Sequence, residues 1–290
     1  AFLEETVALQ AFQYEIALEG RRDPELAKDV RALYDAYIEA TRISLEAIGI
    51  EGSDAFTRMV FGPTHRYGTS AVGTEASVRA LAVDDLRGFH RAFYQPASAA
   101  LVVTGDVRTD ALMPLLERAF GGWQNANPSP RARIPAPTQV ARGQIYLIDK
   151  PGAAQSVIQL GWVGVPRSTP DYFTIEVLNT ILGGSFSSRL NRNLREEHGY
   201  AYGAGSGFDM RLSGGAFLAR ASVQTDKTAE ALKEFFNELR GISAAPVPDE
   251  ELSRARNFVA LGFPGEFETS GDRARKLEEL LVYALPETYF

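Results

Sequence analysis

The stretch LGGSFSSRLNRNLREEHGYAYGAGSGF, residues 182–208, carries the strongest structural signals in this chain of 290 residues. Leu190 and Leu194 lie four residues apart, which predicts a helix over 186–197 with both side chains facing inward. Ser185 stands where the first turn of that helix needs a cap for its backbone N–H groups. The segment therefore predicts a capped amphipathic helix.

A glycine-dotted strand is expected to follow this helix. Gly199 fits the left-handed position that ends a helix, and Tyr200 and Tyr202 then lie on one face of the strand. The other face carries no side chains, because its positions are Gly203, Gly205 and Gly207. Such a bare face allows close approach of another backbone. The order of helix and then strand disfavours a dinucleotide site, which needs a strand, a glycine turn and then a helix.

Composition excludes several other classes of function. The net charge is −7, so no basic excess is available for broad nucleic-acid binding. The chain contains no cysteine, which removes disulfides, thiolate zinc sites and cysteine nucleophiles together. The sequence has no run of about eighteen apolar residues, so it predicts no membrane span.

Helical and strand patterns mix along the chain without strict alternation, which indicates an α+β fold of the α/β roll type. The expected domains are residues 1–125 and 144–290, joined by a proline-rich linker over 126–143. Helices are predicted over 1–60, 77–94, 110–123, 171–184, 227–242, 249–263 and 270–285, the last capped by Ser270. Strands are predicted over 99–107, 144–151, 155–166 and 214–225.

An internal similarity supports two related domains. Segments 101–123 and 218–242 share the order of strand, Thr-Asp turn, helix and glycine, which suggests two copies of one module. The chain begins without methionine and stops soon after a helical pattern meets Pro286. We therefore expect a fragment, shortened at both ends.

The three histidines do not form a recognisable metal motif. His65, His90 and His198 are far apart in sequence, and no pair has the helical spacing of His-Glu-x-x-His or His-x-x-Glu-His. No serine lies in a Gly-x-Ser-x-Gly frame, which disfavours serine hydrolysis. We expect no zinc site built from this chain alone.

Three arginines recur along the predicted helix. Arg189, Arg192 and Arg195 lie three residues apart, and composition alone favours a solvated face paired with Glu196 and Glu197. The spacing by itself does not separate this structural interpretation from a binding role. A purely structural role is equally open for the two tyrosines that follow.

The same stretch resembles a known family. Residues 182–208 strongly resemble the C-terminal half-signature of the pitrilysin-type zinc peptidases, which include insulin-degrading enzyme and mitochondrial processing peptidase. The segment FGPTHRYGTSAVGTEASVRALAVDDLRGFHRAFYQPASAALVVTGDV, residues 61–107, is similar to the family's first domain downstream of its metal motif. Residues 265–290 are similar to the second domain's penultimate helices. The resemblance covers about residues 40–290.

The resemblance implies a fold of two similar α/β domains that form half of a clamshell around a peptide-holding chamber. It also implies a catalytic pair, an arginine and a tyrosine seven residues apart, which here are Arg195 and Tyr202. It selects Tyr202 over Tyr200. The neighbouring residues Gly183, Gly184, Ser185 and Phe186 are expected to bind the substrate peptide.

The family's zinc motif is missing from this sequence. The resemblance therefore implies a zinc-dependent endopeptidase component whose metal is held by a missing segment or by a homologous zinc-bearing subunit. Glu39 and Glu46 fall near a later ligand position of the family, but neither is assigned as a ligand. This chain alone is expected to be inactive.

An alternative within the same resemblance is a non-catalytic scaffold, like the core proteins of respiratory complexes. Retention of both Arg195 and Tyr202 favours the peptidase component over that alternative. The sequence does not give the substrate or the compartment; for a bacterial member, periplasm or cytoplasm is expected.

Overall fold

The computed structural model describes residues 55–124 and 133–290. The chain divides into two units: Ala1–Ala55 with Gln144–Pro151, and Phe56–Gly143 with Gly152–Phe290. Because most of the first unit lies outside the described residues, the helical pattern over 1–54 and the expected domain boundaries stay predictions. No helix of the described part is long and apolar enough to cross a membrane.

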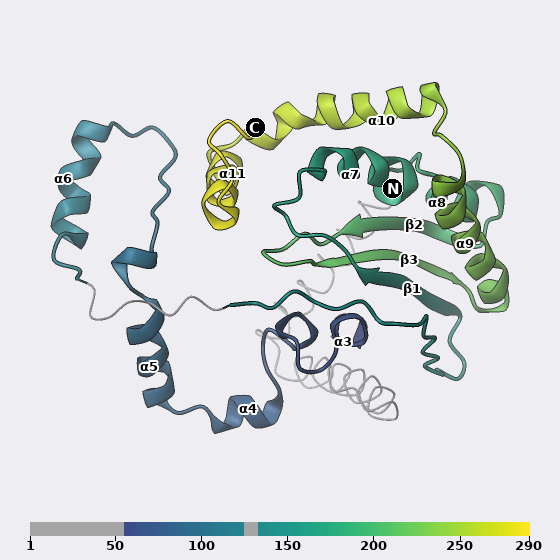
Figure 1. Cartoon of the computed structure of the whole chain (residues 1–290), viewed down its shortest axis with the longest axis horizontal. Coiled ribbons are helices and arrows are strands. Elements are labelled where there is room, and N and C mark those ends of the chain that lie inside the picture. Colours follow the sequence, from purple (N-terminus) through teal and green to yellow (C-terminus); the bar gives the residue numbers. More distant parts are fainter. Residues whose placement is uncertain (1–54, 125–132) are drawn as a thin grey trace, which may run out of the picture. The chain divides into compact units, whose positions relative to one another are not determined.

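The second unit contains a three-stranded antiparallel sheet (Figure 1). Its strands are β1 (Gln155–Val163), β2 (Ala201–Phe208) and β3 (Ala216–Gln224), in the order β1-β3-β2. Strand β3 alternates between buried and exposed positions over most of its length, as the predicted half-buried strand requires. The α+β class is confirmed, and every strand pair of the described sheet is antiparallel.

One face of the sheet holds the main core. Phe217, Ala219, Ala221 and Val223 of β3 are buried there against Phe235 of helix α9 (Thr228–Ala244). Leu190 and Leu194 join the same cluster and are fully buried, so the predicted inward face of the 186–197 segment is confirmed.

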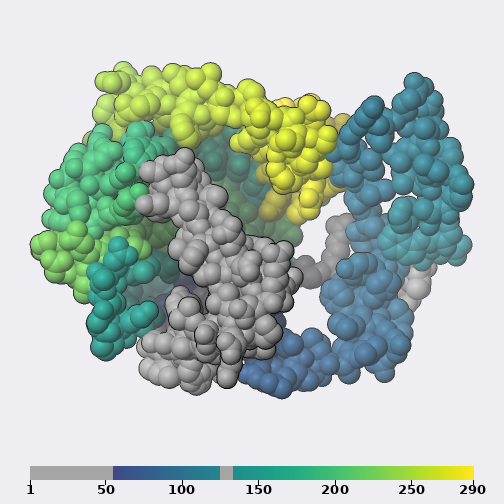
Figure 2. All heavy atoms as spheres, turned by 180° about the vertical axis from the view of Figure 1, so that it is seen from behind, coloured from purple at the N-terminus to yellow at the C-terminus, as the bar shows by residue number. Residues whose placement is uncertain are grey.

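The helices predicted over 171–184, 227–242, 249–263 and 270–285 are present. They comprise α7 (Tyr172–Asn179), α9, α10 (Asp249–Gly262) and α11 (Ser270–Tyr283). In the space-filling view α10 and α11 form one continuous band of surface (Figure 2). Between α10 and α11 lies the short 3-10 helix η6 (Phe263–Phe267).

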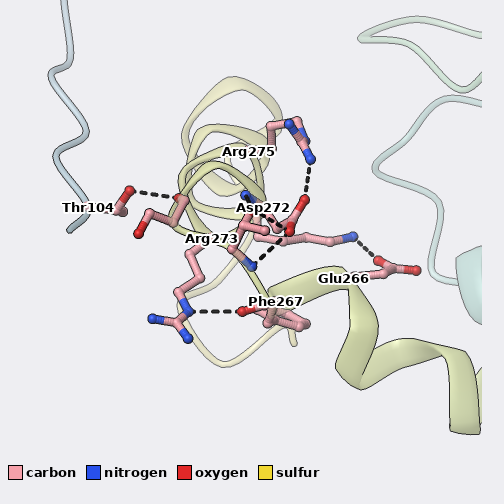
Figure 3. Close-up of polar contacts among 9 residues, drawn as sticks. Thr104, Glu266, Phe267, Asp272, Arg273 and Arg275 are labelled. Carbon is pink, nitrogen blue, oxygen red and sulfur yellow. Dashed lines mark hydrogen bonds and ion pairs between the residues drawn. The ribbon is translucent and has the colours of Figure 1, made fainter.

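The capping residue of α11 differs from the prediction by one position. Its cap is Thr269 rather than Ser270, because the Thr269 hydroxyl accepts a bond from the backbone N–H of Asp272 at 3.1 Å. Asp272 in turn pairs with Arg275, while Arg273 donates to the Phe267 carbonyl at 2.9 Å (Figure 3). These bonds fix the turn between η6 and α11.

A buried arginine connects the end of the β1 segment to α11. Arg167 is only 3% exposed; it pairs with Glu279 at 2.5 Å and donates to the Tyr289 hydroxyl at 2.7 Å. Its guanidinium carbon also lies 3.6 Å from the ring centre of Tyr172. Burial raises the pKa of Tyr172 to about 12, so this phenol stays neutral at physiological pH.

The described part of the first half is helical and largely exposed. It contains α3 (Ala55–Phe61), α4 (Glu75–Ala80), α5 (Val83–Phe93) and α6 (Thr109–Phe120), with 3-10 turns η1 (Arg66–Gly68) and η2 (Pro96–Ser98). Helices α4, α5 and α6 contain no buried residue. Only α3 and η1 contribute to a core, through Val60, Phe61 and Tyr67.

Two predicted strands are wrong. Residues 99–107 and 144–151 contain no strand, and Leu101 and Ile145 are 60% and 90% exposed. A β-branched run becomes a strand only where a neighbour satisfies its backbone groups, and no described strand pairs with either segment. The internal similarity therefore holds for α6 and α9, while the preceding strand forms only in the second copy.

Candidate functional site

The segment between α7 and β2 is built from two π-helical turns. Helix α7 continues into η3 (Thr180–Gly184), and the short helix α8 (Arg189–Asn191) continues into η4 (Arg192–Glu197). The predicted helix over 186–197 thus begins only at Arg189, and its second half is π rather than α. Single π turns inside α-helices are frequent at functional sites.

Ser185 does not cap this helix. Its hydroxyl donates to the Thr180 carbonyl of η3 at 3.0 Å, so it closes the preceding turn instead. Ser188 occupies the N-cap position without a side-chain bond. Gly199 has a φ of 64°, which confirms the predicted left-handed end.

The π turn η4 places Arg195 beside two aromatic rings. The guanidinium carbon of Arg195 lies 4.5 Å from the ring centre of Phe186 and 5.4 Å from that of Tyr202. Both distances are within the range of cation–π attraction. The side chains of Phe186 and Tyr202 are 64% and 45% exposed. The structure therefore brings together a cation, a phenol and an aromatic ring on an accessible surface.

The three arginines have three different environments. Arg189 forms a bidentate pair with Glu251, and Arg192 pairs with Glu197 at 3.3 Å. Arg195 has no ion pair within the described residues, and its guanidinium lies beside the two rings. Of the pairs expected with Glu196 and Glu197, the described residues show only that of Arg192 with Glu197. The charge of Arg195 is therefore available to a ligand.

A β-bulge lies at Tyr202. Ala201 and Ala204 pair with Val223 and Ala221, so Tyr202 and its neighbour Gly203 together oppose a single residue of β3. Bulges bend a strand and redirect its side chains, and they are frequent beside active sites. The bulge explains why Tyr202 is exposed while both flanking pairs face the core.

Asn191 connects the pieces of this cluster. Its side-chain amide donates to the Phe186 carbonyl at 2.6 Å, and its oxygen accepts from the Ala204 N–H at 3.2 Å. The side chain is buried, with 5% exposed. Sequence reasoning missed this residue; the available signal was an asparagine, a poor helix former, inside a predicted helix.

Close backbone packing occurs at part of the glycine face. A Cβ on Gly183 would lie 2.3 Å from the Ser206 nitrogen, and one on Gly205 would lie 3.0 Å from the Gly183 carbonyl oxygen. A Cβ on Gly207 would meet nothing within 4 Å. The predicted close approach is confirmed at Gly205 and absent at Gly207.

The four residues predicted to bind substrate lie in three different surroundings. Gly183 and Gly184 line a cavity of about 510 Å³ together with residues of β2 and β3. Ser185 faces α10 in a much smaller cavity of about 30 Å³. Phe186 lies beside Arg195, whose guanidinium also lies beside the ring of Tyr202.

Comparisons with known proteins agree with this architecture. The family described as Peptidase M16 inactive domain matches residues 80–259, which is more than half of the chain. The chain belongs to this family. The resemblance to the pitrilysin-type zinc peptidases is thereby confirmed. A second family, the Tetracyclin repressor-like C-terminal domain, matches residues 2–62, which lie mostly outside the described part.

Relatives of this chain are named zinc proteases. An uncharacterised zinc protease of Streptomyces coelicolor is 30% identical over 79% of the chain and 50% of its own length. A Mycobacterium leprae zinc protease is 29% identical over 72% of the chain and 47% of its own length. The chain thus spans about half the length of these curated relatives.

A solved structure shares the fold of the M16 inactive domain. The crystal structure of a peptidase M16 inactive domain from Pseudomonas fluorescens has a TM-score of 0.71 at 23% identity. The match covers 81% of this chain and 56% of that one. At this level of identity the likeness establishes the fold.

The histidines in the described part of this chain do not fit a zinc site. His65 accepts from the Tyr67 N–H through Nδ1 and donates to the Pro135 carbonyl through Nε2, as expected for a loop histidine bonded to backbone. His90 stacks on Tyr94, and His198 stacks on Tyr200. Within residues 55–124 and 133–290, no three acidic or histidine side chains are placed to hold a metal ion.

The pair of Arg189 and Glu251 anchors the site to α10. The two nitrogens of Arg189 lie 2.9 and 2.6 Å from the carboxylate oxygens, and both side chains are about 15% exposed. Hydrogen bonding to Arg189 holds the pKa of the Glu251 carboxyl below its usual value. In this chain the pair fixes α8, and thus the π turn η4 that carries Arg195.

Proposed function

We propose that this chain is the metal-free, substrate-holding component of a zinc-dependent endopeptidase. In this proposal Phe186, Arg195 and Tyr202 meet the substrate peptide near the bond that is cleaved. The chain's family and the names of its relatives support the peptidase setting. The observation that carries the proposal is the accessible cluster that Arg195 forms with both rings.

Each residue of the cluster has a distinct role in the proposal. The guanidinium of Arg195 has a rigid set of N–H donors, which binds peptide carbonyls or a carboxylate in a fixed orientation. The Tyr202 hydroxyl donates a hydrogen bond to the carbonyl oxygen as negative charge develops on it. Phe186 packs against an apolar side chain of the peptide. The two rings also hold the Arg195 guanidinium in place.

The zinc ion is proposed to belong to another segment or to a homologous subunit. The described residues of this chain do not fit it, as their histidines are occupied by packing and backbone bonds. Assembly with a zinc-bearing relative would then place the Arg195–Tyr202 pair opposite the metal. The chain's own contribution is binding, orientation and hydrogen bonding.

Photo-crosslinking tests whether peptide meets the cluster. A benzophenone side chain replaces Phe186, and biotinylated peptides of mixed sequence are added together with a zinc-bearing family member. The matched control is Phe236 on α9, which is 39% exposed and also lies beside an arginine, Arg240, at 5.5 Å. We expect several-fold more crosslinked peptide from position 186.

Equal crosslinking from positions 186 and 236 would contradict the proposal. In that case any exposed aromatic ring beside an arginine binds peptide non-specifically. The result would then favour a non-catalytic scaffold. Competition by an excess of unlabelled peptide must reduce the signal at 186, because a specific site saturates.

A further inference from the structure

The face of the sheet opposite the core is hollowed beside β2. Gly205 pairs with Arg220, and Gly207 pairs with Leu218, so these four residues share that face. A cavity of about 510 Å³ opens there, and Phe56 of α3 forms one of its walls. Its size is within the range of small-ligand pockets, and it lies on the same strand as Tyr202.

The missing side chain of Gly207 helps to keep this cavity open. A Cβ at this position would meet no atom within 4 Å, and the residue does not have a left-handed backbone. Its conformation therefore does not require glycine, and neither does packing. When neither backbone conformation nor packing requires a glycine inside a strand, the glycine suggests that a ligand occupies the space that a side chain would fill.

The charge at the cavity that has no ion pair within the described residues is positive. Two charged residues line it, Asp209 and Arg220. The carboxylate of Asp209 is already paired with Arg211, with a hydrogen bond of 2.7 Å. Arg220 is exposed and has no ion pair among the described residues. The available charge in the cavity is thus a guanidinium.

We propose that this cavity is a specificity pocket for an acidic side chain of the substrate peptide. Arg220 binds the carboxylate, while Leu218 and Phe56 contact the apolar part of that side chain. This inference rests on the proposed function, because the occupant is the same peptide. Arg220 lies opposite Gly205, three residues along β2 from Tyr202, which is about 10 Å in a strand. The acidic residue then lies about three positions from the cleaved bond.

The test measures binding of three labelled peptides that differ at one position, which is Glu, Gln or Lys. Dissociation constants are measured by fluorescence anisotropy with the chain and its zinc-bearing partner, with the metal removed to prevent cleavage. We expect the Glu peptide to bind about tenfold more tightly than the Lys peptide, as for a charge-assisted hydrogen bond. Arg220→Glu should reverse that preference. Gly207→Val should abolish it by filling the cavity, and valine also suits a strand.

Lys233→Glu is the control, since it makes the same charge change on an exposed position of α9 and should preserve the preference. If peptides bind but Arg220→Glu and Lys233→Glu change the preference for the Glu peptide equally, the cavity is not the specificity pocket, while the proposed function stands. If no peptide binds the wild-type assembly, both are overturned.

Discussion

Tyr202→Phe is expected to lower kcat for peptide cleavage by about 10²- to 10³-fold when the chain is combined with its zinc-bearing partner. The substitution removes only the hydroxyl, so the ring stays beside Arg195, 5.4 Å from its guanidinium. The lost hydrogen bond matters most when charge develops on the carbonyl oxygen. KM should therefore change much less than kcat.

Tyr200→Phe is the matched control for this substitution. Tyr200 lies two residues earlier, packs against the main core and stacks on His198 with ring centres 5.0 Å apart. Its hydroxyl has no role in the proposed site, so kcat should stay within about twofold of wild type. Equal losses in the two variants would show that the effect arises from stability, and a normal rate for Tyr202→Phe would remove its assigned role.

Gly183→Ala is expected to reduce the free energy of unfolding by about 1–3 kcal/mol, the usual cost of overpacking. The new methyl group would lie 2.3 Å from the backbone nitrogen of Ser206 and 2.8 Å from the carbonyl carbon of Gly205. Both neighbours are backbone atoms of β2, so η3 and β2 must move apart to accommodate it. Urea unfolding followed by circular dichroism measures the change.

Gly207→Ala provides the comparison on the same strand. Its added methyl group meets nothing within 4 Å, and it removes a glycine from a strand interior, so the stability should be unchanged or slightly higher. A loss for Gly207→Ala as large as that for Gly183→Ala would mean that general strand propensity, rather than the close approach of η3, decides the cost.

The elements after residue 150 could largely be predicted from local signals. Alternation identified β3, and three- and four-residue spacing identified α7, α9, α10 and α11. The failures share one physical cause, because residues 99–107 and 144–151 are apolar enough for strands but have no described pairing partner. Pairing depends on tertiary context, which a local pattern does not contain.

The candidate site could be predicted only in part. The resemblance selected Arg195 and Tyr202, and the structure places them together, although their catalytic role stays a prediction. The spacing of apolar residues does not predict a π turn or a β-bulge, because each inserts one residue into an otherwise regular pattern. The one signal for Asn191 was an asparagine inside a predicted helix, and that signal does not show that its side chain connects Phe186 to β2.

The comparison of Arg195→Ala with Arg192→Ala tests the central claim most directly. The two arginines lie on the same π turn and carry the same charge, but Arg192 pairs with Glu197 while Arg195 contacts the rings of Phe186 and Tyr202. The measurement is kcat/KM for peptide cleavage by the assembled enzyme. We predict a loss of about 10- to 100-fold for Arg195→Ala, as for a lost charged hydrogen bond, and less than about twofold for Arg192→Ala. Equal rates for the two variants would contradict the account.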